Sequence, residues 1–419
     1  MTDLAWIEAA LTSARPQVLG ALVRYFRDVD LAEEAFQDAS LRALKTWPQN
    51  GPPRNPTAWL ILVGRNVAID TTRRQRKQTT LPDADVPDEE EGSLAERLDD
   101  AHYRDDVLRL LFICCHPDLP PTQQIALALR IVSGLTVKQI ARAFLVSEAA
   151  MEQRITRAKT RIAQADVPFE TPDAVERAER LGVVAAMVYL VFNEGYSAGH
   201  EDADRAQLCE EAIRLARLLV RLFPGEPEIM GLTALLLLQH SRAAARFDAR
   251  GEVVLLDRQD RSQWNRELIG EGLAMLDKAL RHRSPGPYQV QAAISALHAR
   301  AVKAEDTDWA QIDRLYASLE QLQPSPVVTL NRAVAVSKTL GAAAALAMVE
   351  PLGKQLSGYF HFWGVKGALL KELGRPVEAR EAFDRAIALA NTAAEAAHIR
   401  MHLDQLMGVG SEPSRSSSE

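Results

Sequence analysis

The stretch GLTVKQIARAFLVSEAAMEQRITRAK at residues 134–159 constrains the fold most, because two short amphipathic segments follow one another within it. Thr136 and Gln139 have the spacing of a capping box, which predicts the start of a first helix. Ser147 is the expected N-cap of a second helix. Apolar residues recur at helical spacing on one side of this second helix: Met151, Ile155, Ala158 and Ile162. The pattern predicts a helix-turn-helix with a basic second helix, although any two packed helices can share such a pattern.

The charge of the chain is unevenly distributed. The formal net charge is −7, yet residues 1–77 hold 11 Lys/Arg against 8 Asp/Glu, and residues 107–165 hold 8 against 3. Residues 78–106 hold 11 Asp/Glu against 2 Lys/Arg, so we expect an acidic linker that is extended at least in its first half. This linker is either a solubilising spacer or a mimic of nucleic acid that occupies a basic surface. The two basic blocks are compatible with nucleic-acid binding, which depends on local patches rather than on net charge.

Length and composition indicate several helical domains. At 419 residues the chain has room for about three domains. Aromatic residues make up only 6% while Ala and Leu abound, which favours helices over strands and predicts an all-α fold. The first residues lack the features of a signal peptide, and the longest apolar run, residues 183–192, is too short to span a membrane. With only three cysteines no disulfide framework is expected, so we expect a reduced, cytoplasmic protein.

Residues 30–47, DLAEEAFQDASLRALKTW, have the periodicity of an amphipathic helix. Its apolar side is predicted to contain residues at helical spacing: Leu31, Ala35, Ala39, Leu41 and Leu44. The opposite side carries acidic and amide residues: Glu33, Glu34, Gln37 and Asp38. Taken alone, this second face is compatible with an ordinary solvated helix surface.

A further helix is predicted in NPTAWLILVGRNVAIDTTRRQRK, residues 55–77. Asn55 is the expected N-cap, and Pro56 suits the first helical position. The helix is expected to end in a cluster of cations: Arg73, Arg74, Arg76 and Lys77. Cations stabilise the C-terminus of a helix dipole, so the cluster is explained either by helix stability or by contacts to phosphates.

Together these motifs resemble an RNA polymerase sigma factor of the extracytoplasmic-function group. Residues 30–47 are similar to region 2.2 of that family, the helix that binds core polymerase. Residues 55–77 are similar to regions 2.3 and 2.4, which melt and read the minus-10 promoter element, and residues 119–162 are similar to region 4, which reads the minus-35 element. The order and separation of the three motifs make the match specific over about residues 10–165.

The resemblance implies three sets of binding residues. Those for core polymerase are Asp30, Glu33, Glu34, Gln37 and Asp38. Those for the minus-10 element are Asn66, Asp70, Arg73 and Arg74. Those for the minus-35 element are Glu148, Ala149, Glu152, Gln153, Thr156, Arg157 and Lys159. The residue types agree with these roles, because cations hold a separated strand, and Arg and Gln reach base edges in the major groove.

Residues 172–410 resemble the long C-terminal extension of one sigma subgroup, with stretches such as VYLVFNEGYSA at residues 188–198. The later half also resembles tetratricopeptide repeats, whose offsets are occupied by Trp363, Gly367, Leu370, Ala379, Phe383 and Ala386. Lys366 and Asn391 depart from that motif. We therefore expect antiparallel helix pairs that form a groove for a protein or peptide, followed by a disordered tail at residues 411–419.

Three features that could suggest chemistry have simpler explanations. In the CCHP stretch at residues 114–117 the cysteines are adjacent, whereas zinc sites use spaced pairs, so burial in a helix is expected. Glu194 has no nucleophile or second carboxylate at a defined spacing, and a turn through Gly195 at a helix end is expected. The QDR stretch at residues 259–261 is expected to make a structural ion pair or a domain-docking contact. We therefore expect no enzymatic activity, no metal and no cofactor.

The sequence thus predicts a transcription initiation factor with region 2 at residues 1–77, the linker at 78–106, region 4 at 107–165 and the extension at 172–410. Its expected partners are core RNA polymerase, promoter DNA and a protein or peptide bound by the extension, with no membrane association. We also expect the extension to regulate the sigma half in cis. Two other classes remain open: a repeat scaffold tethered to DNA or polymerase by its sigma-like half, and a helix-turn-helix repressor, which would have no use for a melting helix.

Overall fold

The computed structural model describes residues 5–76, 100–144, 146–164, 174–197, 203–249, 251–390, 396 and 399–403. Within these residues the fold is all-α, as predicted, and the only β pairing is an isolated bridge between Phe247 and Val253. The chain divides into two compact units, Met1–Gly195 with Gln207–Leu215 and Tyr196–Ala206 with Ala216–Glu419. None of the described helices is long and apolar enough to cross a bilayer.

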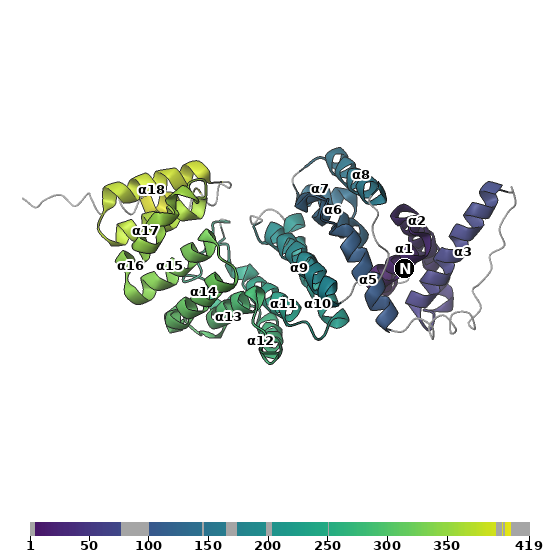
Figure 1. The fold of residues 1–419 in the computed structure, drawn as a ribbon, viewed down its shortest axis with the longest axis horizontal. Coiled ribbons are helices and arrows are strands. Elements are labelled where there is room, and N and C mark those ends of the chain that lie inside the picture. Colours follow the sequence, from purple (N-terminus) through teal and green to yellow (C-terminus); the bar gives the residue numbers. More distant parts are fainter. Residues whose placement is uncertain are drawn as a thin grey trace, which may run out of the picture. The chain divides into compact units, whose positions relative to one another are not determined.

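The first unit begins with three helices that pack on one another: α1 (Ala5–Phe26), α2 (Val29–Asn50) and α3 (Pro56–Arg76) (Figure 1). Indole rings fill their junction, because the Trp47 ring lies 5.4 Å from Trp59 and 6.1 Å from Trp6 between ring centroids. The side chain of Asn55 accepts a hydrogen bond from the backbone N–H of Ala58, so the predicted N-cap of α3 is confirmed.

The remaining helices assigned mainly to this unit follow in order: α5 (Asp100–Cys114), α6 (Pro121–Ile131), α7 (Val137–Ala143), α8 (Glu148–Gln164) and α9 (Ala174–Tyr196). Helix α5 begins at Asp100, so the last residues of the expected linker are helical and residues 77–99 lie outside the described part. Helix α9 ends at Tyr196, one residue after Gly195, so the helix end is found where it was expected, although Gly195 itself is helical. Helix α10 (Ala203–Leu222) is divided between the two units.

Helix α5 packs closely on α1, because Gly20 leaves room for it. A Cβ atom at Gly20 would lie 2.7 Å from the backbone carbon and oxygen of Asp106. The Asp106 carboxylate is buried and pairs with Arg109 at 3.0 Å on its own helix and with Arg24 at 3.4 Å on α1. Buried carboxylates require such partners, so Asp106 acts as part of the core rather than as part of a flexible acidic spacer.

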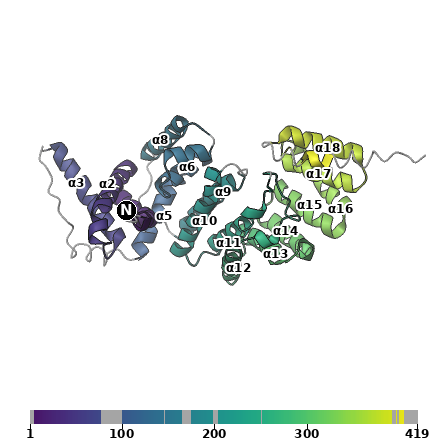
Figure 2. The ribbon, with the colours of Figure 1, turned by 180° about the vertical axis from the view of Figure 1, so that it is seen from behind.

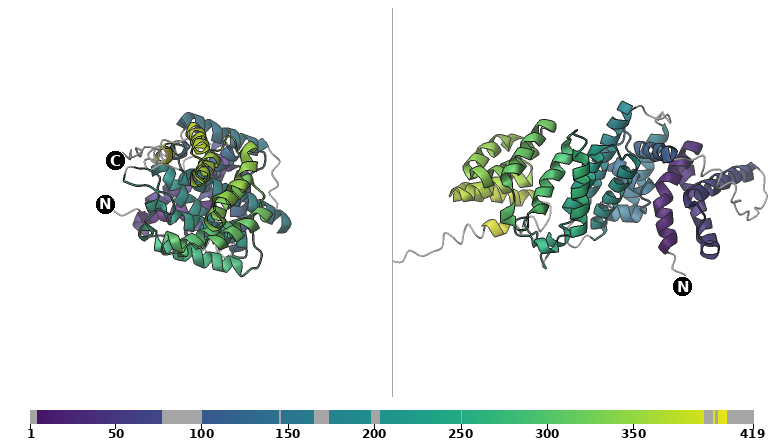
Figure 3. Two further views of the ribbon diagram at one scale, coloured as in Figure 1. Left: turned by 90° about the vertical axis from the view of Figure 1, so that its left-hand side faces the viewer. Right: turned by 90° about the horizontal axis from the view of Figure 1, so that it is seen from below.

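The second unit contains the later helices: α11 (Pro227–His240), α12 (Arg266–Leu280), α13 (Pro287–Arg300), α14 (Trp309–Leu322), α15 (Pro326–Leu340), α16 (Ala342–Val349), α17 (Phe360–Glu372) and α18 (Pro376–Leu389). Short 3-10 turns occur at Ala243–Ala245, Arg261–Gln263, Ala304–Asp306 and Glu350–Lys354. Consecutive helices from α13 to α18 contact one another, and the view from behind shows α17 beside α18 (Figure 2). Figure 3 shows these helices, coloured from green to yellow along the chain, from two further directions.

The close approach of α11 to α13 in the second unit depends on a glycine and on a carboxylate. A Cβ atom at Gly231 of α11 would lie 2.7 Å from the backbone nitrogen of Gln289 on α13. On α11, Glu228 accepts hydrogen bonds from the backbone N–H groups of Tyr288 and Gln289, at 3.0 and 3.2 Å. An anionic side chain at a helix N-terminus satisfies unpaired N–H groups, so Glu228 fixes the start of α13.

Candidate functional site

Helix α2 carries the residues expected to bind core polymerase. Its start is fixed by Asp28, whose carboxylate accepts from the N–H groups of Asp30 and Leu31 at 2.8 and 3.0 Å. Among the expected contact residues, Asp30, Glu34 and Gln37 are exposed and Asp38 is half-buried. Glu33 differs, because only 5% of it is accessible to solvent. The five residues therefore do not share one exposed face.

The leucines of α2 lie on the opposite side from the one expected. Leu31, Leu41 and Leu44 are 47%, 57% and 42% exposed, which corrects their assignment to the apolar core. The buried face consists of smaller residues and two aromatic rings: Ala32, Ala35, Phe36, Ala39, Ala43 and Trp47. Small residues allow α1 and α3 to approach closely, so the larger leucines lie outside this interface. Helix α2 therefore presents a row of leucines and carboxylates to solvent.

Helix α3 carries the residues expected at the minus-10 element in its C-terminal half. Asn66 is exposed. Asp70, Arg73 and Arg74 lie within the helix, but their side chains are outside the described part. All four residues therefore lie on one helix, and among them only the Asn66 side chain is within the described part.

Helices α7 and α8 form the predicted helix-turn-helix. The capping box is confirmed, because Thr136 Oγ1 accepts from the Gln139 N–H at 3.2 Å and the Gln139 side chain accepts from the Thr136 N–H at 2.8 Å. Ser147 caps α8 by accepting from the N–H of Ala150 at 3.2 Å. The predicted apolar stripe of α8 is buried: Met151, Ile155, Ala158 and Ile162.

The face of α8 expected to read the minus-35 element is mostly exposed to solvent. Its exposed members are Glu148, Ala149, Glu152, Gln153, Thr156 and Arg157. Lys159 is the exception, because its side chain is only 20% exposed. A helix with this arrangement can enter the major groove and present polar side chains to base edges.

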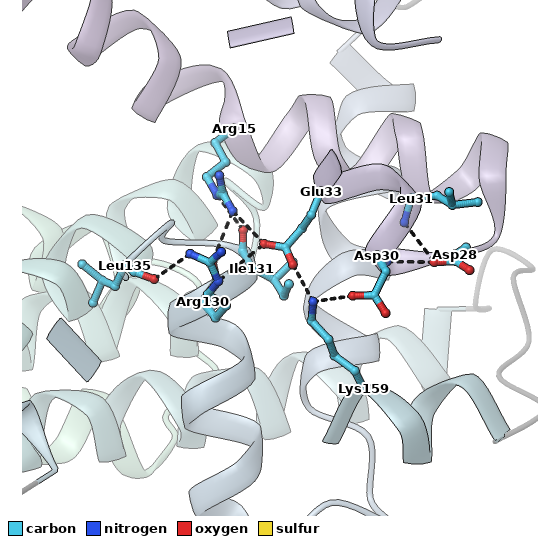
Figure 4. A network of polar contacts seen from close by, with 9 residues as sticks. All are labelled: Arg15, Asp28, Asp30, Leu31, Glu33, Arg130, Ile131, Leu135 and Lys159. Carbon is cyan, nitrogen blue, oxygen red and sulfur yellow. Dashed lines mark hydrogen bonds and ion pairs between the residues drawn. The ribbon is translucent and has the colours of Figure 1, made fainter. Parts of the chain in front are cut away.

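Lys159 joins α8 to α2 (Figure 4). Its ammonium group lies 2.5 Å from Asp30 Oδ1 and 2.6 Å from Glu33 Oε2. Burial alone would lower the pKa of Lys159, but the hydrogen bonds and charges of these two carboxylates raise it above its usual value. Residues expected to bind polymerase and a residue expected to bind DNA are thus bonded to each other.

Two arginines complete the surroundings of Glu33. Arg15 Nη2 and Arg130 Nε lie 3.3 and 3.7 Å from Glu33 Oε1. Arg15 on α1 also donates to the carbonyl groups of Ile131 and Arg130, at 2.9 and 3.3 Å, and lies over the Phe36 ring. Burial lowers the pKa of Arg15 to about 10, an effect that the Glu33 charge opposes. Sequence reasoning missed this cluster, because its bonded residues are up to 129 residues apart along the chain and no local pattern marks their pairing.

Among the described residues, no group of three or more His, Cys, Asp or Glu side chains could hold a metal ion. Cys114 and Cys115 are free and buried, as expected, and burial raises the pKa of the Cys115 thiol to about 12. Arg261 is buried and donates to the carbonyls of His298 and Ala301 at 2.5 and 2.7 Å. It therefore holds the last turn of α13 through backbone contacts rather than through the expected ion pair.

Three separate parts of the chain match known protein families. Residues 11–78 match Sigma-70 region 2, residues 109–162 match Sigma-70, region 4, and residues 180–280 match a family of unknown function, DUF6596. The chain is also 71% identical over 411 residues to an uncharacterized protein of Rhizobium meliloti (strain 1021), with 97% of each chain covered. Sigma-70 regions 2 and 4 serve transcription initiation by binding core RNA polymerase and promoter DNA.

Helices α2 and α3 lie within the region 2 match, and α6, α7 and most of α8 lie within the region 4 match. The DUF6596 match covers most of α9, all of α10 and α11, and α12. The order of these three domains agrees with that expected from the motifs. The chain therefore carries Sigma-70 regions 2 and 4 followed by a DUF6596 domain, which is the domain make-up of an extracytoplasmic-function-like sigma factor with a C-terminal extension.

Proposed function

We propose that the chain is a sigma factor of the extracytoplasmic-function group that acts in the cytoplasm, where polymerase and promoters are found. In this proposal α2 binds core polymerase, the C-terminal half of α3 reads and melts the minus-10 element, and α8 reads the minus-35 element. A chain with these two readers on separate helices needs no palindromic site and no catalytic residue of its own.

The observation that supports the polymerase contact most strongly is the set of exposed leucines on α2. Leu41 and Leu44 lie about one helical turn apart, whereas Leu31 lies about 15 Å from them along the helix axis. Single exposed apolar side chains are common on protein surfaces, but the pair Leu41 and Leu44 beside Gln37 forms a small apolar patch that suits a partner surface. Leucines supply apolar area to such an interface, and the carboxylates select a basic partner surface.

We assign the promoter contacts from the positions of residues on α8 and α3. For α8 these are Glu148, Ala149, Glu152, Gln153, Thr156, Arg157 and Lys159, of which Arg157 is proposed to bind a base edge and Lys159 a phosphate. For α3 they are Asn66, Asp70, Arg73 and Arg74. The buried stripe of α8 supports this assignment, because it leaves one polar face for the groove.

We further propose that the extension is a tetratricopeptide-like domain that regulates the sigma half by binding a protein or peptide. The close packing of α17 on α18 supports this proposal, because Gly367 lies against the Phe383 ring and Leu370, Ala379 and Ala386 are buried. The second unit also contains a cavity of about 580 Å³ whose apolar walls include Trp309, Phe360 and Val365. The exposed cations Arg258 and Lys338 line the same cavity together with the exposed carboxylates Asp257 and Glu372, so the cavity suits an apolar segment that carries charges of both signs.

A binding measurement with core polymerase tests the α2 assignment. Reversing charge at Glu34 and Asp38 (Glu34→Lys with Asp38→Lys) should weaken the complex about tenfold or more, since carboxylates opposite a basic surface become cations. The matched control reverses two exposed carboxylates on α18, Glu381→Lys with Asp384→Lys, and should bind as the wild type does. Equal affinity of the α2 variant and the control would contradict the assignment.

A further inference from the structure

The cavity of the second unit has one positive charge in excess. The Arg, Lys, Asp and Glu side chains that line it are Arg258, Arg261, Lys338, Asp257 and Glu372. Four of them are exposed, and among these four the two cations balance the two carboxylates. Arg261 differs, because only 7% of it is accessible to solvent. The excess positive charge therefore belongs to the buried residue of the lining.

The fold uses only one end of the Arg261 guanidinium group. Nη1 donates to the carbonyls of His298 and Ala301 at 2.5 and 2.7 Å, which accounts for both of its N–H groups. Nη2 makes one long contact, 3.4 Å to Thr307 Oγ1, and Nε has no hydrogen-bond partner among the described residues. Nε and Nη2 form an edge of the guanidinium that can bind a carboxylate through two parallel hydrogen bonds. This edge remains for an acceptor that the fold does not supply.

Arg261 also lacks a counter-ion within the described part of the chain. It forms no ion pair there, and its guanidinium carbon lies 4.9 Å from the centre of the Trp264 ring. Burial and then the charge of Arg242 lower the pKa of Arg261, an effect that Asp306 opposes without pairing with it. A buried charge is costly unless a group of opposite sign is nearby. An anion in the cavity would offset this cost.

The rest of the cavity suits an apolar body of modest size. Its volume is about 580 Å³, within the range of about 300–1,000 Å³ that is typical of small-molecule sites. Its apolar walls include Leu255, Trp309, Val334, Phe360, Val365 and Leu369. One excess positive charge matches a monoanion, whereas a phosphate monoester carries about 1.5–2 negative charges at pH 7 and would also face the two carboxylates. The lining therefore favours a single carboxylate attached to an apolar body.

From these observations we propose that the cavity binds a small organic acid. Its carboxylate takes the Nε and Nη2 edge of Arg261, replacing the long contact to Thr307, and its apolar body packs on the walls from α14 and α17. The acid occupies the part of the cavity beside the buried arginine, whereas a partner segment would contact the exposed charges. The inference goes beyond the proposed function, because binding of the acid requires neither the sigma half nor core polymerase.

Calorimetric titration of the full chain with octanoate tests the proposal, with octanamide as the matched neutral probe. Octanoate should bind at least about tenfold more tightly than octanamide, because only the acid brings a negative charge to Arg261. Equal affinities would show that apolar burial alone accounts for the binding and would overturn the proposal. The absence of octanoate binding would overturn it as well.

Two variants separate Arg261 from the exposed cations of the lining. Arg261→Gln should weaken octanoate binding about tenfold and leave octanamide binding unchanged. Arg258→Gln removes an exposed cation from the same lining and should weaken octanoate binding by less than about threefold, because exposed charges are screened by water and salt. An effect of Arg258→Gln equal to or larger than that of Arg261→Gln would contradict the assignment.

A third variant tests the location without disturbing the contacts that Arg261 makes at the end of α13. Ala368 is exposed on α17 and lines the cavity, so Ala368→Phe fills part of the cavity while the core stays intact. It should reduce the binding of both probes at least about tenfold. Unchanged octanoate binding in Ala368→Phe would place the acid elsewhere and refute the proposal. These titrations contain no polymerase, so their failure would leave the proposed sigma function untouched.

Discussion

At the scale of single residues, Glu33 and His298 show two ways in which cations act on a buried group. Glu33 stays close to three cations that pair with its charge. His298 lies beside Trp309, with ring centroids 5.3 Å apart, and near the charges of Arg242 and Arg261. Burial and then these two arginines lower the pKa of His298 to about 4, so its imidazole is neutral at pH 7.

The His298 shift predicts that the second unit loses stability in mild acid. The pKa is about 4 in the folded chain and about 6.5 when unfolded, so stability is complete above pH 6.5 and falls towards pH 4. Between pH 7.5 and 5 the wild type should lose about 2 kcal/mol more than His298→Gln. Hydrogen exchange of amides in α13 and α14, corrected for intrinsic rates, measures this difference. If the wild type and His298→Gln lose the same unfolding free energy between pH 7.5 and 5, the His298 imidazole is not held neutral in the folded chain.

Residue-level prediction succeeded where the information is local. The cap of Thr136 on Gln139 and the stripe from Met151 to Ile162 depend on spacing alone, and both are present. The orientation of α2 could not be read in this way. Hydrophobicity ranks leucine above alanine, but close packing of α1, α2 and α3 selects small side chains for the inside. The burial of Glu33 depends on Lys159, a residue that only tertiary folding brings near.

At the scale of elements, the pair α17 and α18 depends on the contact between Gly367 and the Phe383 ring. Gly367→Ala would place a Cβ atom 2.6 Å from that ring and should cost about 1–3 kcal/mol of unfolding free energy. On the same helix, a Cβ atom at Gly364 would meet only Ile399, at 3.5 Å. Gly364→Ala should therefore stabilise the unit by up to about 1 kcal/mol through helix propensity. Urea unfolding followed by Trp363 fluorescence compares the two, and shifts of the same sign would contradict the packing described.

Element boundaries were predicted less well than element types. The acidic composition of residues 78–106 indicated a linker, but helix α5 begins within it at Asp100. Composition could not reveal that Asp106 pairs with Arg24 and Arg109 in the core, because these ion pairs offset its burial. The start of α8 was predicted correctly because its cap, Ser147, is a local signal.

At the scale of the whole molecule, the unit boundary determines how the extension can be tested. A truncation after Asp166 would remove α9, whose Arg180 lies over the Phe112 ring of α5. A truncation after Phe223 keeps both α9 and α10 complete and is the better design. If the extension regulates the sigma half in cis, residues 1–223 and the full chain should differ in promoter output with the same core polymerase. Equal promoter output from residues 1–223 and from the full chain, with and without cell extract, would show that the extension does not regulate the sigma half.

Reconstituted transcription measures whether the chain directs core polymerase to specific promoters. Purified core polymerase is mixed with the full chain and a library of double-stranded genomic fragments, and the 5′ ends of the RNA are mapped. With the wild-type chain we expect discrete start sites that core polymerase alone does not produce. With Arg157→Ala we expect discrimination at one upstream base pair to fall by about 1–3 kcal/mol. Transcripts from the wild-type chain identical to those of core polymerase alone would contradict the assignment of this chain as a functional sigma factor.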